Sequence, residues 1–199
     1  MIFQELSIPG VWLIEPEKQA DHRGFFARAW CQREFEARGL TTSFVQGNIS
    51  FNKKKGTLRG LHYQAPPYEE AKLVRCTQGA LYDVIVDLRQ DSPALGQWLA
   101  VDLSAENYRM LFIPAGVAHG FQTLADNTEI FYQMSEFYQA DAARGIRWDD
   151  PELNITWPLP EPIISPKDLS FDDLRTWETA GEGRAAAASS IAITVEGQP

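Results

Sequence analysis

The sequence is divided into short extended runs by turns rich in glycine and proline, and it contains little that could form a long helix. Runs of β-forming residues recur at a spacing of roughly 8–12 residues, which is typical of an antiparallel sandwich or barrel. In the run 81–89, Tyr82, Val84 and Val86 fall on one face, whereas Asp83 and Ile85 fall on the other. The pattern therefore predicts an all-β fold.

Two short helices are expected within this β framework. Residues 31–38 form an amphipathic segment with Phe35 on its apolar side, and Gly39 is a typical helix stop. A second short helix is expected at 169–177. Between the N-terminal extended runs and the first helix, residues 21–24 predict a turn and residues 25–30 a strand.

Length and composition limit the organisation of the chain. Its 199 residues fit one domain, which we place at 1–180, including a wrap rich in proline and tryptophan after residue 140. Residues 181–199 are small and polar and are expected to form a C-terminal tail, in which 191–195 could add an edge strand.

The charge and the cysteine content indicate the class of partner and the compartment. The net charge of −9 argues against a nucleic-acid partner, although Lys53, Lys54, Lys55 and Arg59 could bind the phosphate of a small molecule. No run is apolar enough to span a membrane, and the N-terminus does not resemble a secretory signal. We expect a cytoplasmic protein whose two cysteines are free thiols.

The segment 56–75 brings a histidine close to several cations in sequence. His62 lies among Arg59, Lys72 and Arg75, and strict alternation would place Arg59 and His62 on opposite faces of a strand. Nearby cations favour the neutral imidazole, which is the form that can act as a base. The alternative is a histidine with a purely structural role. We interpret this segment as one wall of an acid/base site.

Other candidates each have a functional and a structural interpretation. His119, after a Pro-Ala-Gly turn, either faces the same cavity or caps the turn, whereas His22 is expected to be exposed. Tyr132 belongs either to an aromatic core or to a proton-donating pair with His62. Asp168 is a surface residue unless the C-terminal wrap returns it to His62, where a carboxylate would fix the tautomer.

A metal site is the alternative to an acid/base site. Some β-barrel proteins bind Fe, Mn or Zn through a His-x-His pair, a glutamate and a third histidine. Here Gln64 stands at the second position of the pair, so that only His62, Glu69 and His119 remain as ligands. Neighbouring cations would also oppose a divalent ion. The sequence contains no glycine-rich dinucleotide loop and no phosphate-binding loop.

Six motifs together resemble the dTDP-4-dehydrorhamnose 3,5-epimerase family over about residues 1–177. They are GTLRGLHYQ at 56–64, KLVR at 72–75, DVIVDLR at 83–89, IPAGVAHGF at 113–121, GIRW at 145–148 and SPKD at 165–168. The resemblance implies a cupin-type jelly roll, a homodimer, and an isomerase that needs neither a metal nor a cofactor. The implied substrate is a nucleotide-diphospho-4-keto-6-deoxyhexose, most simply dTDP-4-dehydro-6-deoxyglucose.

The resemblance also implies residue roles. His62 would be the base, Asp168 its hydrogen-bonded partner, Lys72 the group that stabilises the enolate, and Tyr132 the acid on the opposite face. The residues expected to bind the substrate are Arg23, Arg28, Gln46, Asn48, Arg59, His119, Tyr138 and Lys167.

Two positions depart from the family pattern. Arg28 and Ala143 stand where the family usually has glutamate, which makes the nucleotide base an open question. The sequence also leaves open whether C3, C5 or both are inverted, because one acid/base pair serves both reactions. A metal-dependent cupin oxygenase or isomerase and a non-catalytic sugar-nucleotide binding protein remain as alternative hypotheses.

Overall fold

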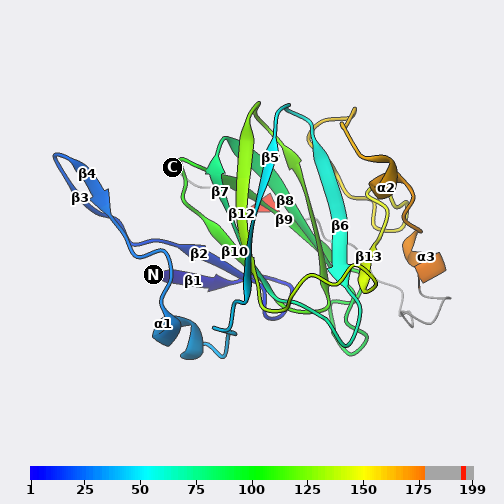
Figure 1. The fold of residues 1–199 in the computed structure, drawn as a ribbon, viewed down its shortest axis with the longest axis horizontal. Helices are drawn as coiled ribbons and strands as arrows, with labels where there is room; N and C mark the ends of the chain where they lie inside the picture. The colour runs from blue at the N-terminus through cyan, green and yellow to red at the C-terminus, as the bar shows by residue number, and fades with distance from the viewer. Residues whose placement is uncertain (178–193, 196–199) are drawn as a thin grey trace.

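Two six-stranded sheets face each other and form the body of the protein in the computed structural model, which describes residues 1–177 and 194–195 (Figure 1). The first sheet has the order β1-β2-β10-β7-β12-β5 and the second the order β13-β6-β11-β8-β9-β14. All pairings are antiparallel except that of β14 with β9. This arrangement confirms the expected all-β, cupin-type jelly roll.

The strands of the first sheet are β1 (Ile2–Glu5), β2 (Trp12–Glu15), β5 (Gln46–Asn52), β7 (Lys72–Gln78), β10 (Met110–Ile113) and β12 (Thr128–Met134). Those of the second are β6 (Leu58–Gln64), β8 (Ala80–Asp87), β9 (Trp98–Ser104), β11 (Val117–Thr123), β13 (Ala143–Gly145) and β14 (Thr194–Val195). A separate hairpin joins β3 (Gln19–Asp21) to β4 (Gly24–Phe26). The helices are α1 (Gln32–Glu36), α2 (Pro166–Leu169) and α3 (Leu174–Trp177).

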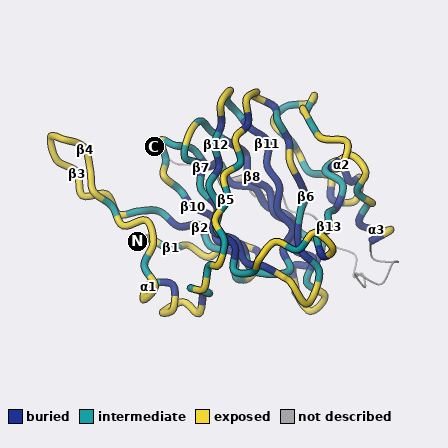
Figure 2. The backbone as a smooth tube through the Cα atoms, viewed as in Figure 1, coloured by how far each residue is buried: buried dark blue, intermediate teal, exposed yellow. Residues whose placement is uncertain are grey.

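Both faces of strand β8 are buried, and each face contributes to a different apolar layer. Leu81 and Ile85 point between the sheets, where they join the central core with residues such as Val74 and Leu111. The opposite face of β8 packs against the Pro/Trp-rich wrap, with Trp177 buried there. The alternation expected for 81–89 is therefore confirmed within β8, which is buried from Leu81 to Asp87 (Figure 2).

The predicted first helix is present in shortened form. Cys31 precedes α1, and Phe35 is fully buried against the outer face of the first sheet, where it contacts the rings of Phe3 and Phe112. The prediction of one short helix at 169–177 is wrong. Two separate turns form instead, and the first of them begins upstream at Pro166 because Ser165 caps it.

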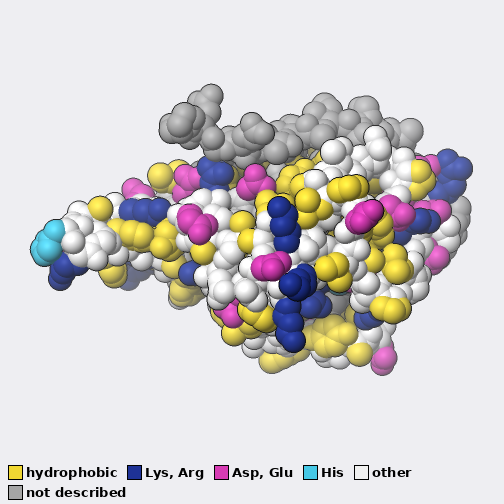
Figure 3. All heavy atoms as spheres, turned by 90° about the horizontal axis from the view of Figure 1, so that it is seen from above, with side chains coloured by type: hydrophobic (Ala, Val, Ile, Leu, Met, Phe, Trp, Pro, Cys, Tyr) yellow, Lys and Arg dark blue, Asp and Glu magenta, His cyan; other side chains and the backbone are white. Residues whose placement is uncertain are grey.

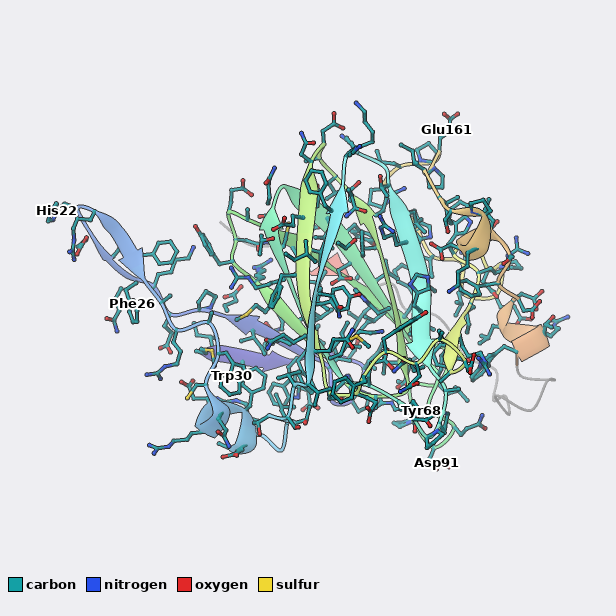
Figure 4. All side chains as sticks on the ribbon, in the orientation of Figure 1. His22, Phe26, Trp30, Tyr68, Asp91 and Glu161 are labelled. Atoms are coloured by element: carbon teal, nitrogen blue, oxygen red, sulfur yellow. The ribbon has the colours of Figure 1, made fainter. Side chains whose placement is uncertain are left out.

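The hairpin β3–β4 projects from the body as an arm (Figures 1 and 3). His22 lies at its tip, as Figure 4 shows, and the side chain of Phe26 is 72% exposed. The strand expected at 25–30 ends at Phe26 because the following residues find no partner strand in the described part of the chain. The exposure expected for His22 is confirmed.

Strand β6 departs from simple alternation, and this departure shapes the site. His119 faces His62 and Phe121 faces Arg59, so β6 holds one residue more than β11 over this interval. At Gly60 φ is +129°, and a Cβ atom there would lie 2.5 Å from the Cα of Gly120. The prediction that Arg59 and His62 point to opposite faces is wrong, because this bulge turns both toward one cavity.

The tail expected at 181–199 lies outside the described residues apart from β14, whose two residues extend the edge of the second sheet. Cys31 and Cys76 are free thiols, as expected. None of the helices in the described segments is long and apolar enough to cross a membrane.

Candidate active site

A cavity of about 570 Å³ opens between the two sheets and collects most of the predicted site residues. Those that line it are Arg59, His62, Lys72, His119, Tyr132, Tyr138 and Lys167. They come from strands of both sheets, from the loop after β12 and from the C-terminal wrap, segments far apart in the sequence. Arg75 does not join them, because it shares the outer face of β7 with Leu73.

His62 is paired with Asp168. Its Nε2 atom lies 2.8 Å from Oδ1 of Asp168, whose side chain is only 6% exposed, whereas that of His62 is 43% exposed. The wrap therefore does return the carboxylate to the imidazole. Ser165 explains the local placement, since its Oγ accepts the backbone N–H of Asp168 and so caps helix α2.

The environment of Asp168 favours its ionised form. Burial alone would raise the pKa of this carboxyl group, but the hydrogen bond with His62 and those with Gly60 and Ser165 hold the pKa below its usual value. An ionised carboxylate accepts hydrogen bonds only, so in the neutral imidazole of His62 the proton is on Nε2 and the lone pair is on Nδ1. The arrangement gives the cavity a base with a defined tautomer.

The ring of His62 is also held from a second side. Phe171 packs edge-on against it, with ring centroids 5.6 Å apart and an angle of 74° between the planes. The Phe171 ring occupies the space that any side chain at position 145 would need, so glycine is required there. This contact could not be predicted from the sequence, because Phe171 lies in an irregular segment without periodicity.

Lys72 lies at the wall of the cavity, where its charge is balanced. Its Nζ atom is 2.8 Å from Oε1 of Glu70 and donates to the backbone oxygen of His62 at 3.2 Å. Both side chains are almost fully buried, 8% and 4% exposed. The sequence interpretation missed Glu70, although a carboxylate two residues before a strand lysine could have suggested a pair.

Tyr132 reaches the cavity from β12, in the sheet that faces β6. Burial raises the pKa of its phenol, an effect that Arg59 opposes and that Glu70 and Tyr138 reinforce. The phenol thus stays protonated through the physiological pH range and can donate a proton.

A second histidine–aspartate pair lies beside the first. His119 faces His62 across neighbouring strands, and its Nε2 contacts Oδ1 of the fully buried Asp83. The other carboxylate oxygen of Asp83 has no hydrogen-bond partner among the described atoms. The cavity-facing interpretation of His119 is therefore the one that the geometry favours, and Asp83 is a residue that the sequence interpretation placed in a strand without a role.

The remaining predicted binding residues divide into two groups. Gln46 and Asn48 lie on β5 beside Tyr132 and bond to each other at 3.0 Å, and Gln46 also accepts the backbone N–H of Tyr138. Arg23 and Arg28, in contrast, lie on or just after the projecting arm. There they pair with Asp21 and Glu34, away from the cavity of their own chain.

The metal alternative finds little geometric support. Within residues 1–177 and 194–195, no three His, Cys, Asp or Glu side chains converge as metal ligands. Glu69, the glutamate of the hypothetical ligand set, lines a different pocket from His62 and His119. The carboxylate that does enter the cavity belongs to Glu70 and is paired with Lys72.

Residues 5–176 match the family model described as dTDP-4-dehydrorhamnose 3,5-epimerase. The chain belongs to this family. The dTDP-4-dehydrorhamnose 3,5-epimerase of Shigella flexneri is 49% identical over 164 residues, which cover 82% of this chain and 90% of the relative.

Solved structures agree with this membership. A Bacillus anthracis dTDP-4-dehydrorhamnose 3,5-epimerase with TDP and PPi bound has a TM-score of 0.84 at 45% identity, covering 87% of this chain and 99% of that one. A Legionella pneumophila enzyme in complex with dTDP-4-keto-L-rhamnose has a TM-score of 0.84 at 38% identity, covering 94% and 99%. As a member of the dTDP-4-dehydrorhamnose 3,5-epimerase family, the chain is an isomerase.

Proposed function

We propose that this epimerase inverts C3, C5 or both in a dTDP-linked 4-keto-6-deoxyhexose by removing and returning a proton, without a cofactor. The observation that carries the proposal is the convergence of the His62–Asp168 pair and Tyr132 on one cavity from facing sheets. The nucleotides held by the Bacillus anthracis and Legionella pneumophila structures support a thymidine diphosphate moiety.

The first step is the removal of a proton from carbon. The C4 ketone acidifies the hydrogens on C3 and C5, and Nδ1 of His62 takes one of them while Asp168 stabilises the resulting imidazolium. The electron pair of the broken C–H bond moves into the C4 carbonyl, which becomes an enolate. The ammonium of Lys72 stabilises that oxygen, an interaction typically equivalent to about 3–4 kcal/mol of barrier.

The second step returns a proton from the opposite side. The phenol of Tyr132 gives its proton to the planar enolate carbon, so the C–H bond re-forms with inverted configuration and the phenolate remains. Transfer of a proton from imidazolium to phenolate, through water or substrate, restores the starting state. The raised pKa of Tyr132 keeps the acid form available for this step.

We infer that Arg59, Lys167, His119, Gln46, Asn48 and Tyr138 bind the sugar and the diphosphate. All of them line the cavity or adjoin it on β5. The two departures from the family pattern fall in different places. Ala143 lines the cavity, whereas Arg28 pairs with Glu34 beside helix α1.

We further propose that the enzyme is a homodimer, in which the arm of one subunit completes the cavity of the other. Such an assembly would bring Arg23 and Arg28 to a substrate and would cover the exposed Phe26. Edge strand β5, whose Ile49 is 65% exposed and lines the cavity, is a suitable docking surface for the partner's arm. The free thiols are consistent with a reducing compartment such as the cytoplasm.

The dimer is tested by light scattering on the purified protein. We expect twice the mass of one chain for the wild type and a shift toward one chain for Phe26→Asp, because a carboxylate cannot be buried at an apolar contact without a partner. Asp21→Asn, on the same arm but at a polar position, is the matched control. A wild-type mass of one chain at micromolar concentration would contradict the proposal.

The function is tested by exchange with deuterated solvent. With dTDP-4-dehydro-6-deoxyglucose in D₂O, we expect deuterium at C3, C5 or both and the corresponding epimers by NMR. Tight binding without exchange would instead indicate a non-catalytic binding protein. Activity that appears only with added Fe, Mn or Zn would support the metal-dependent alternative.

A further inference from the structure

Glu70 contributes a buried carboxylate to the cavity, and no catalytic step described above requires this charge. It precedes β7 and is 6% exposed, and it lines the same cavity as His62 and Tyr132. Buried carboxylates are retained where they pair with a cation or accept hydrogen bonds. Glu70 does both, which indicates that its position is specified by the site.

The two oxygens of Glu70 have different partners. Oε1 lies 2.8 Å from Nζ of Lys72, and Oε2 accepts the backbone N–H of Gln64 at 3.1 Å. The Gln64 side chain in turn bonds to the backbone at Tyr68, Phe137 and Gln139, which fixes this corner of the cavity. The carboxylate is thus anchored to β6 and holds the ammonium from one side.

The ammonium of Lys72 can point only in the direction that its partners leave free. Glu70 and the backbone oxygen of His62 occupy two of its three N–H donors, which leaves one donor for a ligand in the cavity. A lysine side chain that is free to rotate would spend only part of its time in that orientation.

We propose that Glu70 is a positioning residue whose carboxylate fixes the Lys72 ammonium in the orientation that the enolate oxygen requires. This inference rests on the proposed function, because it assigns to Glu70 an effect on the same enolate. It adds a residue that shapes the transition state without touching the substrate.

The charge of Glu70 has a second consequence at the acid that faces it. Together with burial, this carboxylate raises the pKa of Tyr132. Removing the negative charge lowers that pKa, so the phenol loses its proton at a lower pH. The alkaline limb of the pH–rate profile therefore shifts to lower pH. A Glu70 variant leaves the other titratable residues around the cavity in place, namely Arg59, His62, Tyr63, Lys72, His119, Tyr138, Arg144 and Lys167.

The test compares Glu70→Gln with Glu69→Gln in the wild-type enzyme background. The amide keeps the shape of Glu70 and can still accept from Gln64, but it cannot hold the ammonium by charge. We expect kcat for epimer formation to fall about 10- to 100-fold with little change in KM, because the lost interaction belongs to the transition state. Glu69→Gln, which alters the neighbouring side chain outside this cavity, should leave kcat and the profile unchanged.

A direct readout of the phenol keeps the test independent of turnover. The difference in ultraviolet absorbance between each protein and its Tyr132→Phe derivative reports the titration of this one tyrosine. We expect its midpoint to move to lower pH in Glu70→Gln and to return toward the wild-type value in Glu70→Asp, which retains the charge.

Three outcomes would overturn the inference while the wild type still exchanges deuterium. The first is a Glu70→Gln variant with the kcat and pH profile of the wild type. The second is an equal loss of kcat in Glu70→Gln and Glu70→Asp with no change in the titration midpoint of the Tyr132 phenol. The third concerns the double variant that combines Glu70→Gln with Lys72→Met, in which neither buried charge is left without its partner. The inference fails if the losses of kcat in the two single variants add up in this double variant. If the wild type itself exchanges no deuterium, the proposed function fails and this inference fails with it.

Discussion

Replacing His62 with alanine should lower both deuterium incorporation and epimer formation by about 10³-fold or more. General-base catalysis contributes roughly 10²–10⁴-fold, and the imidazole of His62 is the more open to a substrate of the two histidines that line the cavity, since His119 is buried against Asp83. The half-exposed imidazole contributes little to the apolar core, so the folded structure should persist. Initial rates in D₂O by NMR, together with a circular dichroism spectrum, measure both quantities.

Glu161→Ala is the control for this experiment. It truncates an exposed side chain on the side of the molecule away from the arm (Figure 4), outside the lining of the cavity. Its exchange rate should equal that of the wild type. If His62→Ala retained more than a tenth of the wild-type exchange rate, another base would have to be sought in the cavity.

Replacing Tyr132 with phenylalanine should separate proton exchange from inversion. His62 can still remove and return a proton on its own face, so deuterium should enter the substrate with retained configuration. Epimer formation should fall by about 10²–10⁴-fold, because the opposite face has lost its proton donor. The exchanged position and its configuration are both read from the NMR spectrum of the sugar.

Tyr108→Phe provides the corresponding control. Its ring packs against Phe25 at the base of the arm and lies outside the cavity, so loss of that hydroxyl should change neither rate. If Tyr132→Phe lost exchange and inversion in equal measure, the phenol would act in the first step and the assignment of the two faces would be wrong. If inversion persisted, the acid would have to be another residue.

The pattern of the sequence was sufficient for the architecture and for the most local parts of the site. Alternation correctly predicted that Ile85 and Val84 point to opposite faces of β8, because side chains on a regular strand repeat every second residue. In the SPKD motif, the cap from Ser165 fixes Asp168 through neighbouring residues alone, although the helix was expected only from residue 169 and the cap was not predicted. The family resemblance added residue roles for which periodicity gave no basis.

The bulge in β6 could not be predicted from the local sequence pattern. Strict alternation separated Arg59 from His62, and a close approach between Gly60 and Gly120 on two different strands brings them to one face. A sequence pattern describes neighbours along one chain, whereas a bulge depends on which strand lies beside it. The same limit applies to Asp83, whose partner His119 lies on the adjacent strand.

The sequence by itself determined the all-β class, the free thiols, the family and the candidate base. Only the tertiary structure decided that Asp168 contacts His62, that Glu70 holds Lys72, and that Tyr132 enters the same cavity from the facing sheet. The physical reason is the separation along the chain. Secondary structure follows from neighbouring residues, whereas the charge, the tautomer and the direction of a catalytic side chain depend on groups that only folding brings within a hydrogen-bond length.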